Sequence, residues 1–162
     1  MASPVPARPL APDGYPFPDD PEKWLPWSRT VERLEQARNY WLVTASEAGR
    51  PHATPVWGVW IDDALYFDGA PTTRWARNLA ANPQLTVHLE SGDDVVIIEG
   101  TPEDVVTDAD VAERILKAWA VKYGQFAPEP ESSGLFRVRP RSARAWSKAD
   151  LTDGTRWTWP PG

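Results

Sequence analysis

Short runs of alternating apolar and polar residues, separated by turn residues, fill most of the chain between residues 39 and 146. These runs are rich in β-branched and aromatic side chains, so they predict strands with one buried face. The predicted strands cover residues 39–46, 52–61, 64–67, 85–90, 95–106 and 135–146. Pro55, inside the second run, predicts an edge strand or a bulge because proline cannot donate a hydrogen bond to a neighbouring strand.

Three other segments repeat apolar residues at helical spacing and predict helices over about 28–38, 73–82 and 108–123. Ser28 is the expected N-cap of the first helix, and Thr72 or Thr73 that of the second. Thr107 and Asp110 have the spacing of a capping box for the third. Hairpin-linked strands with a few helices beside them predict a mainly β fold, an antiparallel barrel with peripheral helices.

The N-terminal region differs in composition from the rest of the chain. Residues 1–27 hold eight of the 18 prolines and show little periodicity, which predicts an extended arm. Its first 20 or so residues are expected to bury little and to be dispensable for folding, while Trp24, Leu25 and Trp27 anchor its end on the domain. The remaining residues, 28–162, are expected to form a single domain with one core. The tail TRWTWPPG is aromatic but too short to predict an element.

Charge and composition exclude several classes of protein. A net charge of -6 argues against a nucleic-acid partner, and the absence of cysteine excludes disulfides, a thiol nucleophile and thiolate metal sites. No apolar run approaches the roughly 20 residues of a membrane-spanning helix. The N-terminus lacks the apolar core of a signal peptide, so a cytoplasmic location is expected.

The chain carries no familiar catalytic motif, and we predict neither a catalytic constellation nor a metal site. His52 and His88 lie on different predicted strands with no carboxylate at a ligand spacing. The acidic pairs Asp62-Asp63 and Asp93-Asp94 fall in turns, where aspartate is favoured by hydrogen bonds to its own backbone.

Two stretches of this acidic chain contain no acidic residue. The first, 69–89, includes Thr72, Thr73 and Arg74 at a predicted helix N-terminus, where free N–H groups and a guanidinium favour an anion. An ordinary capped helix with a solvated arginine is the alternative. The second stretch, 134–149, forms either a solvated strand face or a ligand groove, and its cations are Arg137, Arg139, Arg141, Arg144 and Lys148.

Ten tryptophans are the other unusual feature of the composition. Six lie on predicted elements: Trp41, Trp57, Trp60, Trp75, Trp119 and Trp146. Such a number would overfill a small barrel core, so some should line a cavity or a subunit interface, where a flat indole suits a flat ligand.

The ordered set of a GRPH turn, PVWGVW, ALYF, TTRWARNLAANP and VVIIEG resembles the pyridoxamine 5'-phosphate oxidase-like split-barrel family, over about residues 28–148. The nearest resemblance is to its flavin- and deazaflavin-dependent oxidoreductases. The resemblance implies a six-stranded antiparallel split β-barrel, the FMN-binding split barrel. It also implies a homodimer with cofactor sites at the subunit interface and few acid–base residues, because the cofactor carries the hydride.

The resemblance also implies which residues contact the cofactor. The family motif Ser/Thr-Arg-Lys, which grips the phosphate, is matched by Thr73 and Arg74, but Trp75 stands at the lysine position. Family cations expected near Thr54 and Val59 are absent as well. The implied cofactor-binding residues are His52, Thr54, Pro55, Val56, Trp57, Trp60, Thr72, Thr73, Arg74, Asn78 and Trp146.

The implied function is hydride transfer between the cofactor and an unknown small organic substrate. The deazaflavin coenzyme (F-420) is favoured, because its singly charged phosphodiester needs fewer cations and its glutamate tail could meet Arg137, Arg139 or Arg141. An FMN-dependent oxidoreductase of the same fold is the alternative, and a non-enzymatic haem- or flavin-binding protein is a third. The tail lacks the Arg-x-His element that pyridoxamine phosphate oxidase uses for its substrate.

Overall fold

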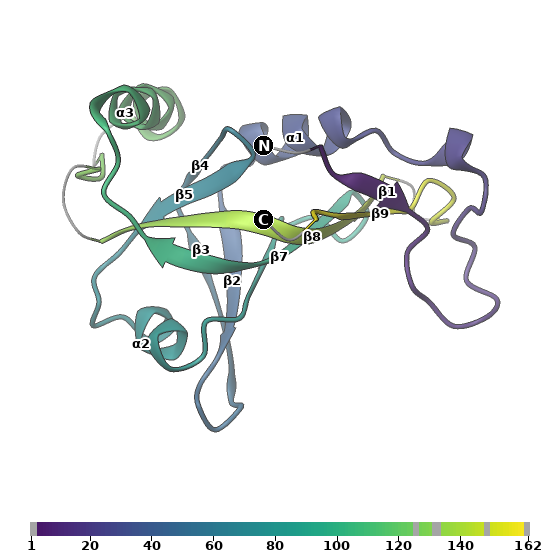
Figure 1. Ribbon diagram of the computed structural model, residues 1–162, viewed down its shortest axis with the longest axis horizontal. Coiled ribbons are helices and arrows are strands. Elements are labelled where there is room, and N and C mark those ends of the chain that lie inside the picture. Colours follow the sequence, from purple (N-terminus) through teal and green to yellow (C-terminus); the bar gives the residue numbers. More distant parts are fainter. Residues whose placement is uncertain (1–2, 125–126, 131–133, 148–149, 161–162) are drawn as a thin grey trace.

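A long antiparallel pair of strands, β7 (Val95–Asp104) and β8 (Leu135–Trp146), runs through the middle of the molecule (Figure 1). The computed structural model describes residues 3–124, 127–130, 134–147 and 150–160. The other strands are β1 (Val5–Ala7), β2 (Tyr40–Ala45), β3 (Pro51–Val56), β4 (Val59–Ile61), β5 (Ala64–Asp68), β6 (Leu85–His88) and β9 (Thr155–Thr158). The helices are η1 (Pro21–Lys23), a 3-10 turn, and α1 (Trp27–Gln36), α2 (Arg74–Ala81) and α3 (Ala109–Tyr123).

The strands pair in the order β1-β9-β8-β7-β6-β2-β3, with every pairing antiparallel. One edge of β8 is divided between two partners: its first residues pair with β5, which carries β4, and its last residues pair with β9. This division splits the barrel. The prediction of a mainly β, antiparallel split barrel with peripheral helices is confirmed.

The predicted strand count of six is wrong, because nine strands are present in the described residues. β1 lies in the arm and β9 in the tail, and both strands are too short to show a pattern of alternation. The predicted strand 52–61 is broken at Trp57 and Gly58 into β3 and β4. A Cβ at Gly58 would lie 2.7 Å from the carbonyl oxygen of Tyr66, so only glycine allows the chain to pass so close to β5.

Alternation along the strands places the core as predicted. In β2, Tyr40, Leu42 and Thr44 are buried, while the residues between them are half-buried on the outer face. β5 is buried on both faces: Leu65 packs into the barrel, whereas Tyr66 packs under α3. The second cluster, between β5 and α3, contains Val59, Ala64, Tyr66, Ile115, Trp119 and Leu135.

The two clusters explain how so many tryptophans are accommodated. Trp60 and Trp75 lie in the barrel core, and Trp119 lies in the second cluster. Trp41 and Trp146 remain half-buried on the outer face, and Trp57 is 40% exposed. The core therefore takes three of the six, and the other three lie toward the surface.

Helix starts follow the predictions only in part. Thr73 caps α2, as expected, with its Oγ1 accepting from Ala76 N at 3.3 Å. Ser28 is not a cap, because α1 begins at Trp27 after Pro26, which supplies no side-chain bond. The Thr107–Asp110 capping box is also wrong. Asp108 caps α3, and its Oδ1 accepts from Val111 N at 2.9 Å.

The N-terminal arm is packed against the sheet rather than free of it (Figure 1, purple). β1 pairs with β9, and Arg8 forms an ion pair with Asp19 at 3.0 Å. The ring of Phe17 fills the space beside Gly154, where a Cβ would lie 2.3 Å from the ring. Most residues of the arm are nevertheless exposed, so its contacts with the sheet are made by β1 and Phe17.

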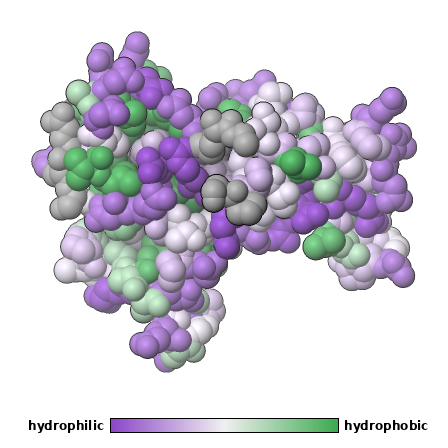
Figure 2. Space-filling model, in the orientation of Figure 1, coloured by the Kyte–Doolittle hydropathy of each residue, from purple (hydrophilic) through white to green (hydrophobic). Residues whose placement is uncertain are grey.

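None of the helices in the described part of the chain is long and apolar enough to cross a membrane. On the face shown in Figure 2, hydrophobic residues lie in separate patches among hydrophilic ones.

We expect Phe17→Ala to destabilise the protein, because the half-buried ring packs beside Gly154 and against Trp146, 6.2 Å away between centroids. A loss of roughly 1–2 kcal/mol is expected for such a ring, and each kcal/mol lowers Tm by about 2–4 °C in a domain of this size. Thermal unfolding measures it. Leu10→Ala, at a residue 80% exposed, is the control. An unchanged Tm for Phe17→Ala would support the expectation that the arm is dispensable for folding.

Candidate functional site

Helix α2 packs against strands β2 and β3 of the barrel. Its apolar residues Trp75, Ala76 and Leu79 enter the core. Asn78, which is also buried, donates from Nδ2 to Thr44 Oγ1 at 3.0 Å. Because Thr44 pairs with His52 across β2 and β3, this bond places α2 beside the start of β3. Breaking a buried hydrogen bond leaves a donor and an acceptor unsatisfied, which costs free energy, so this bond stabilises the position of α2.

The N-terminus of α2 has the features of an anion site. The backbone N–H groups of Arg74 and Trp75 make no hydrogen bond within the described residues, and the first turn holds no acidic residue. Arg74 is exposed and has no ion pair to any described residue. Arg77 is occupied, since its Nη1 donates to the Thr72 carbonyl at 2.7 Å. Arg74 is therefore the guanidinium left for a ligand at this helix end.

Strand β3 lies at the end of the sheet, as Pro55 predicted, and it has no second partner among the described strands. His52, Thr54 and Val56 are half-buried on the face that α2 covers, whereas Pro55 is exposed on the other face. The structure thus brings His52 and Thr54 near α2 and turns Pro55 away from them.

At the other end of β3, the joint between β3 and β4 is held by the last turn of α3. The exposed ring of Trp57 stacks on Tyr123, with centroids 4.6 Å apart and planes 9° apart. Gly58 N donates to Tyr123 Oη at 2.9 Å, and Lys122 Nζ donates to the Gly58 carbonyl at 3.3 Å. We missed Lys122 and Tyr123 in the sequence because they lie more than 60 residues from Gly58 and follow no motif.

The surroundings of Lys122 shift its protonation. Its Nζ also donates to Tyr40 Oη at 3.0 Å, and Tyr40 in turn donates to the Leu34 carbonyl. Burial lowers the pKa of Lys122 to about 8, against the weaker opposing charge of Glu35. Burial likewise raises the pKa of Tyr40. Lys122 is thus a partly buried amine that lies over the rings of Tyr40 and Tyr123.

Two predicted residues lie apart from this region. Trp60 is 5% exposed and packs edge-on against Trp27 in the core, with centroids 6.3 Å apart, so it presents no face to a ligand. Trp146 lies on β8, and three strands separate it from β3. It packs near Phe17 at the other side of the sheet. Within one chain, Trp146 cannot join the site.

At two of the three positions where the family pattern has a cation, the structure explains why this chain has none. Val59 and Trp75 are buried in the two clusters, where a charged side chain would be costly. On β8, Arg137 pairs with Glu103 at 2.6 Å, and Arg141 Nη2 donates to Gln84 Oε1 at 2.8 Å. These two arginines are engaged within the sheet.

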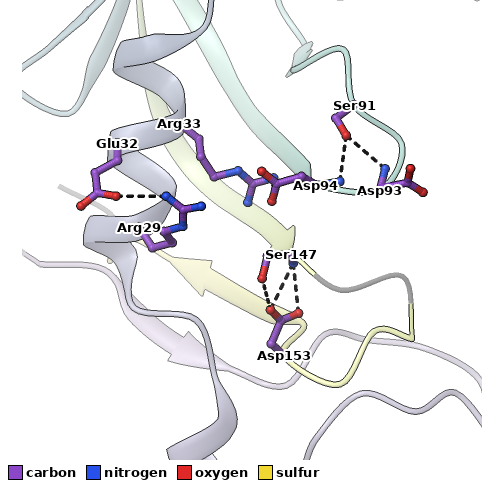
Figure 3. Close-up of polar contacts among 8 residues, drawn as sticks. All are labelled: Arg29, Glu32, Arg33, Ser91, Asp93, Asp94, Ser147 and Asp153. Atoms are coloured by element: carbon purple, nitrogen blue, oxygen red, sulfur yellow. Dashed lines mark hydrogen bonds and ion pairs between the residues drawn. The ribbon is translucent and has the colours of Figure 1, made fainter.

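Arg33 on α1 has a buried side chain that forms an ion pair with Asp94, just before β7 (Figure 3). Its side chain is 6% exposed, and Nη2 lies 2.5 Å from Asp94 Oδ1. Burial lowers the pKa of Arg33, and Asp94 opposes this. Nearby, Asp153 accepts from Ser147 N at 3.0 Å. These bonds tie α1 to the turn before β7 and close the β8–β9 loop. The described residues contain no group of three metal-ligating side chains.

Comparison with known proteins assigns the chain to a family. The profile of the pyridoxamine 5'-phosphate oxidase family matches residues 28–147, so the chain belongs to this family. No curated protein sequence matches the chain.

Solved structures share the fold at low identity. A conserved hypothetical protein from Mycobacterium tuberculosis is 23% identical, with 78% of this chain and 88% of that chain covered and a TM-score of 0.63. An F-420 reductase is 23% identical, with 82% and 98% covered and a TM-score of 0.54. A haem-binding protein from Mycobacterium smegmatis is 19% identical, with 80% and 58% covered and a TM-score of 0.60. Proteins of different function therefore share this fold.

We expect the free energy of unfolding to rise with pH over the range in which Lys122 is deprotonated in the folded protein and still protonated in the unfolded chain. The folded protein releases the Lys122 proton near pH 8, whereas an unfolded lysine keeps it to about 10.5. Unfolding therefore takes up a proton between these values, and stability increases as pH rises through them. Urea unfolding at several pH values measures this. The increase should be smaller in Lys122→Met, and an identical pH dependence in both proteins would contradict it.

Proposed function

We propose that the protein is an oxidoreductase that binds a flavin or deazaflavin coenzyme between the N-terminus of α2 and strand β3, and acts on a small organic substrate. The observation that carries the proposal is the N-terminal end of α2, where Arg74 and two backbone N–H groups have no partner among the described residues. The helix that presents them is anchored by Asn78 to Thr44, beside His52. A phosphate bound there would place the rest of a flat coenzyme along β3.

The family membership and the F-420 reductase neighbour support this proposal. When bound, the coenzyme would supply the hydride chemistry, so the chain needs groups that bind and orient rather than a catalytic acid and base. Thr72, Thr73 and Arg74 would hold the phosphate end. His52, Thr54 and Val56, on the half-buried face of β3, and Trp57 at its end would lie along the ring system.

The deazaflavin coenzyme F-420 is our preferred cofactor, and FMN is the alternative. The positions near Val59 and Trp75 belong to the core, so Arg74 is the strong cationic partner for the phosphate at this site. A singly charged phosphodiester requires less compensation than the doubly charged phosphate of FMN. The argument from the β8 arginines is weaker than the sequence indicated, because Arg137 and Arg141 already have partners in the sheet.

We also propose that the protein is a homodimer formed through the outer face of the sheet. Trp41, His88, Ile97 and Arg144 lie in register across β2, β6, β7 and β8, and all are half-buried on this face. Trp41 and His88 stack with planes 5° apart. Interface cores are enriched in aromatic residues and arginine. Such a dimer offers a route by which Trp146 of one subunit could approach the site of the other.

A haem-binding protein is the second candidate function. It is supported by the haem-binding neighbour from Mycobacterium smegmatis and by His52 on β3, an available axial ligand. The absorption spectrum separates the two functions, since bound haem gives an intense Soret band that flavins and deazaflavins lack.

Titration of the purified protein with F-420 and with FMN tests the proposed function. Arg74→Ala should weaken binding of the preferred coenzyme, because a charge-assisted contact contributes roughly 1.5–3 kcal/mol, which is about tenfold to a hundredfold in Kd. The affinity should also fall with added salt. Arg29→Ala, which removes an exposed arginine paired with Glu32 on α1, is the control. Tighter binding of FMN than of F-420 would reverse the cofactor assignment, and equal affinity in Arg74→Ala would remove Arg74 from the site.

Light scattering at micromolar concentration tests the homodimer. The expected mass is about twice that of the 18.1 kDa chain. Ile97→Glu should yield monomers, because it places a charge in the middle of the proposed interface. Val121→Glu, at an 85% exposed residue of α3, should remain dimeric. A monomeric wild type would refute the interface.

A further inference from the structure

The last turn of α3 contacts the site at a point that no sequence motif indicates. Tyr123 Oη accepts from Gly58 N at 2.9 Å and lies within hydrogen-bond distance of two carbonyls, that of Arg38 at 2.6 Å and that of Gly58 at 2.9 Å. Its single hydrogen serves one carbonyl at a time. Lys122 Nζ supplies a further donor to the Gly58 carbonyl. Both polar groups of the Gly58 backbone are therefore occupied by α3.

The same turn fixes the ring of Trp57. The stacking of Trp57 on Tyr123 leaves the indole 40% exposed yet held at a defined angle. An exposed tryptophan held in this way offers a preorganised surface for a flat ring, and less conformational freedom is lost on binding. Gly58 permits this arrangement because a side chain there would collide with Tyr66.

We propose that Lys122 and Tyr123 are positioning residues that hold the Trp57–Gly58 joint against the coenzyme ring. This inference rests on the proposed function. It adds that the backbone of β3 is available to the coenzyme only up to Val56, and that beyond this point the Trp57 ring alone makes the contact. A helix more than 60 residues away in sequence thereby determines the geometry of the site.

The positioning does not depend on the charge of Lys122. Tyr40 Oη gives its hydrogen to the Leu34 carbonyl, so it accepts from Lys122, and the Gly58 carbonyl also accepts. A neutral amine has two hydrogens, enough for both bonds. Among the described residues, the other charged or titratable groups around Lys122 are Glu35 on α1, Arg38 just after α1, and Tyr123 on its own helix. Coenzyme affinity should therefore stay level through the titration of Lys122.

Tyr123→Phe tests the proposal, because it removes the hydroxyl and keeps the ring. The exchange of the Gly58 amide hydrogen, followed by NMR, should accelerate about tenfold, the effect expected for one lost hydrogen bond. Exchange at Ile98 in the barrel core should not change. The affinity for F-420 or FMN, whichever binds more tightly to the wild type, should fall by about the same factor. Lys122→Met should weaken it as well. Lys117→Met, on an exposed part of the same helix, should not.

A double-mutant cycle then asks whether Tyr123 acts through Trp57. Trp57→Ala alone should weaken coenzyme binding, and adding Tyr123→Phe should cause no further loss, since the ring that it positions is gone. Additive losses would overturn the proposal, as would faster Gly58 exchange with unchanged affinity. A wild type that binds neither coenzyme would overturn the proposed function and the positioning role together, whereas unaffected variants of a binding wild type would overturn the positioning role alone.

Discussion

The antiparallel pairing of β7 with β8 is the constraint on which the rest of the fold depends. The pair has one irregularity, a register shift at Gly100, where Arg141 of β8 is left without a partner on β7. A Cβ at Gly100 would lie 2.6 Å from the Arg139 carbonyl, so glycine allows this close approach. β-bulges of this kind bend a strand and increase its twist. The bend lets one edge of β8 serve β5 at one end and β9 at the other.

The charged contacts within this frame distinguish the arginines of β8 from Arg74. Arginines on β8 meet acceptors on neighbouring strands, as in the pairs Arg137–Glu103 and Arg144–Glu99. Arg33 is buried against Asp94, where it anchors α1. Arg74 has no such partner among the described residues, and it lies where the dipole of α2 also attracts an anion. An acidic protein can thus keep an exposed cation at a helix N-terminus, where an anion is favoured.

Much of the fold, and the placement of part of the candidate site, could be predicted from local pattern. Alternation located the long strands, and the β8 bounds were predicted to the residue, because each strand buries one face. Pro55 indicated an edge strand or a bulge, and Thr73 is one of the two residues predicted to cap α2. The predicted site residues His52, Thr54, Thr73, Arg74 and Asn78 meet around α2 and β3 because a strand, a turn and a helix close together in sequence bring them there.

The sequence by itself determined the strand pattern, the helix that presents Arg74 and the family. The tertiary structure alone decided the break at Trp57 and Gly58, the burial of Trp60 and Trp75, and the pairing of the β8 arginines. It also decided that the arm and tail pair as β1 and β9. The physical reason is the separation of the contacts along the chain. Periodicity indicates which face of a single element is buried, whereas contacts such as that of Gly58 with Tyr123 join distant segments and produce no periodic pattern in the sequence.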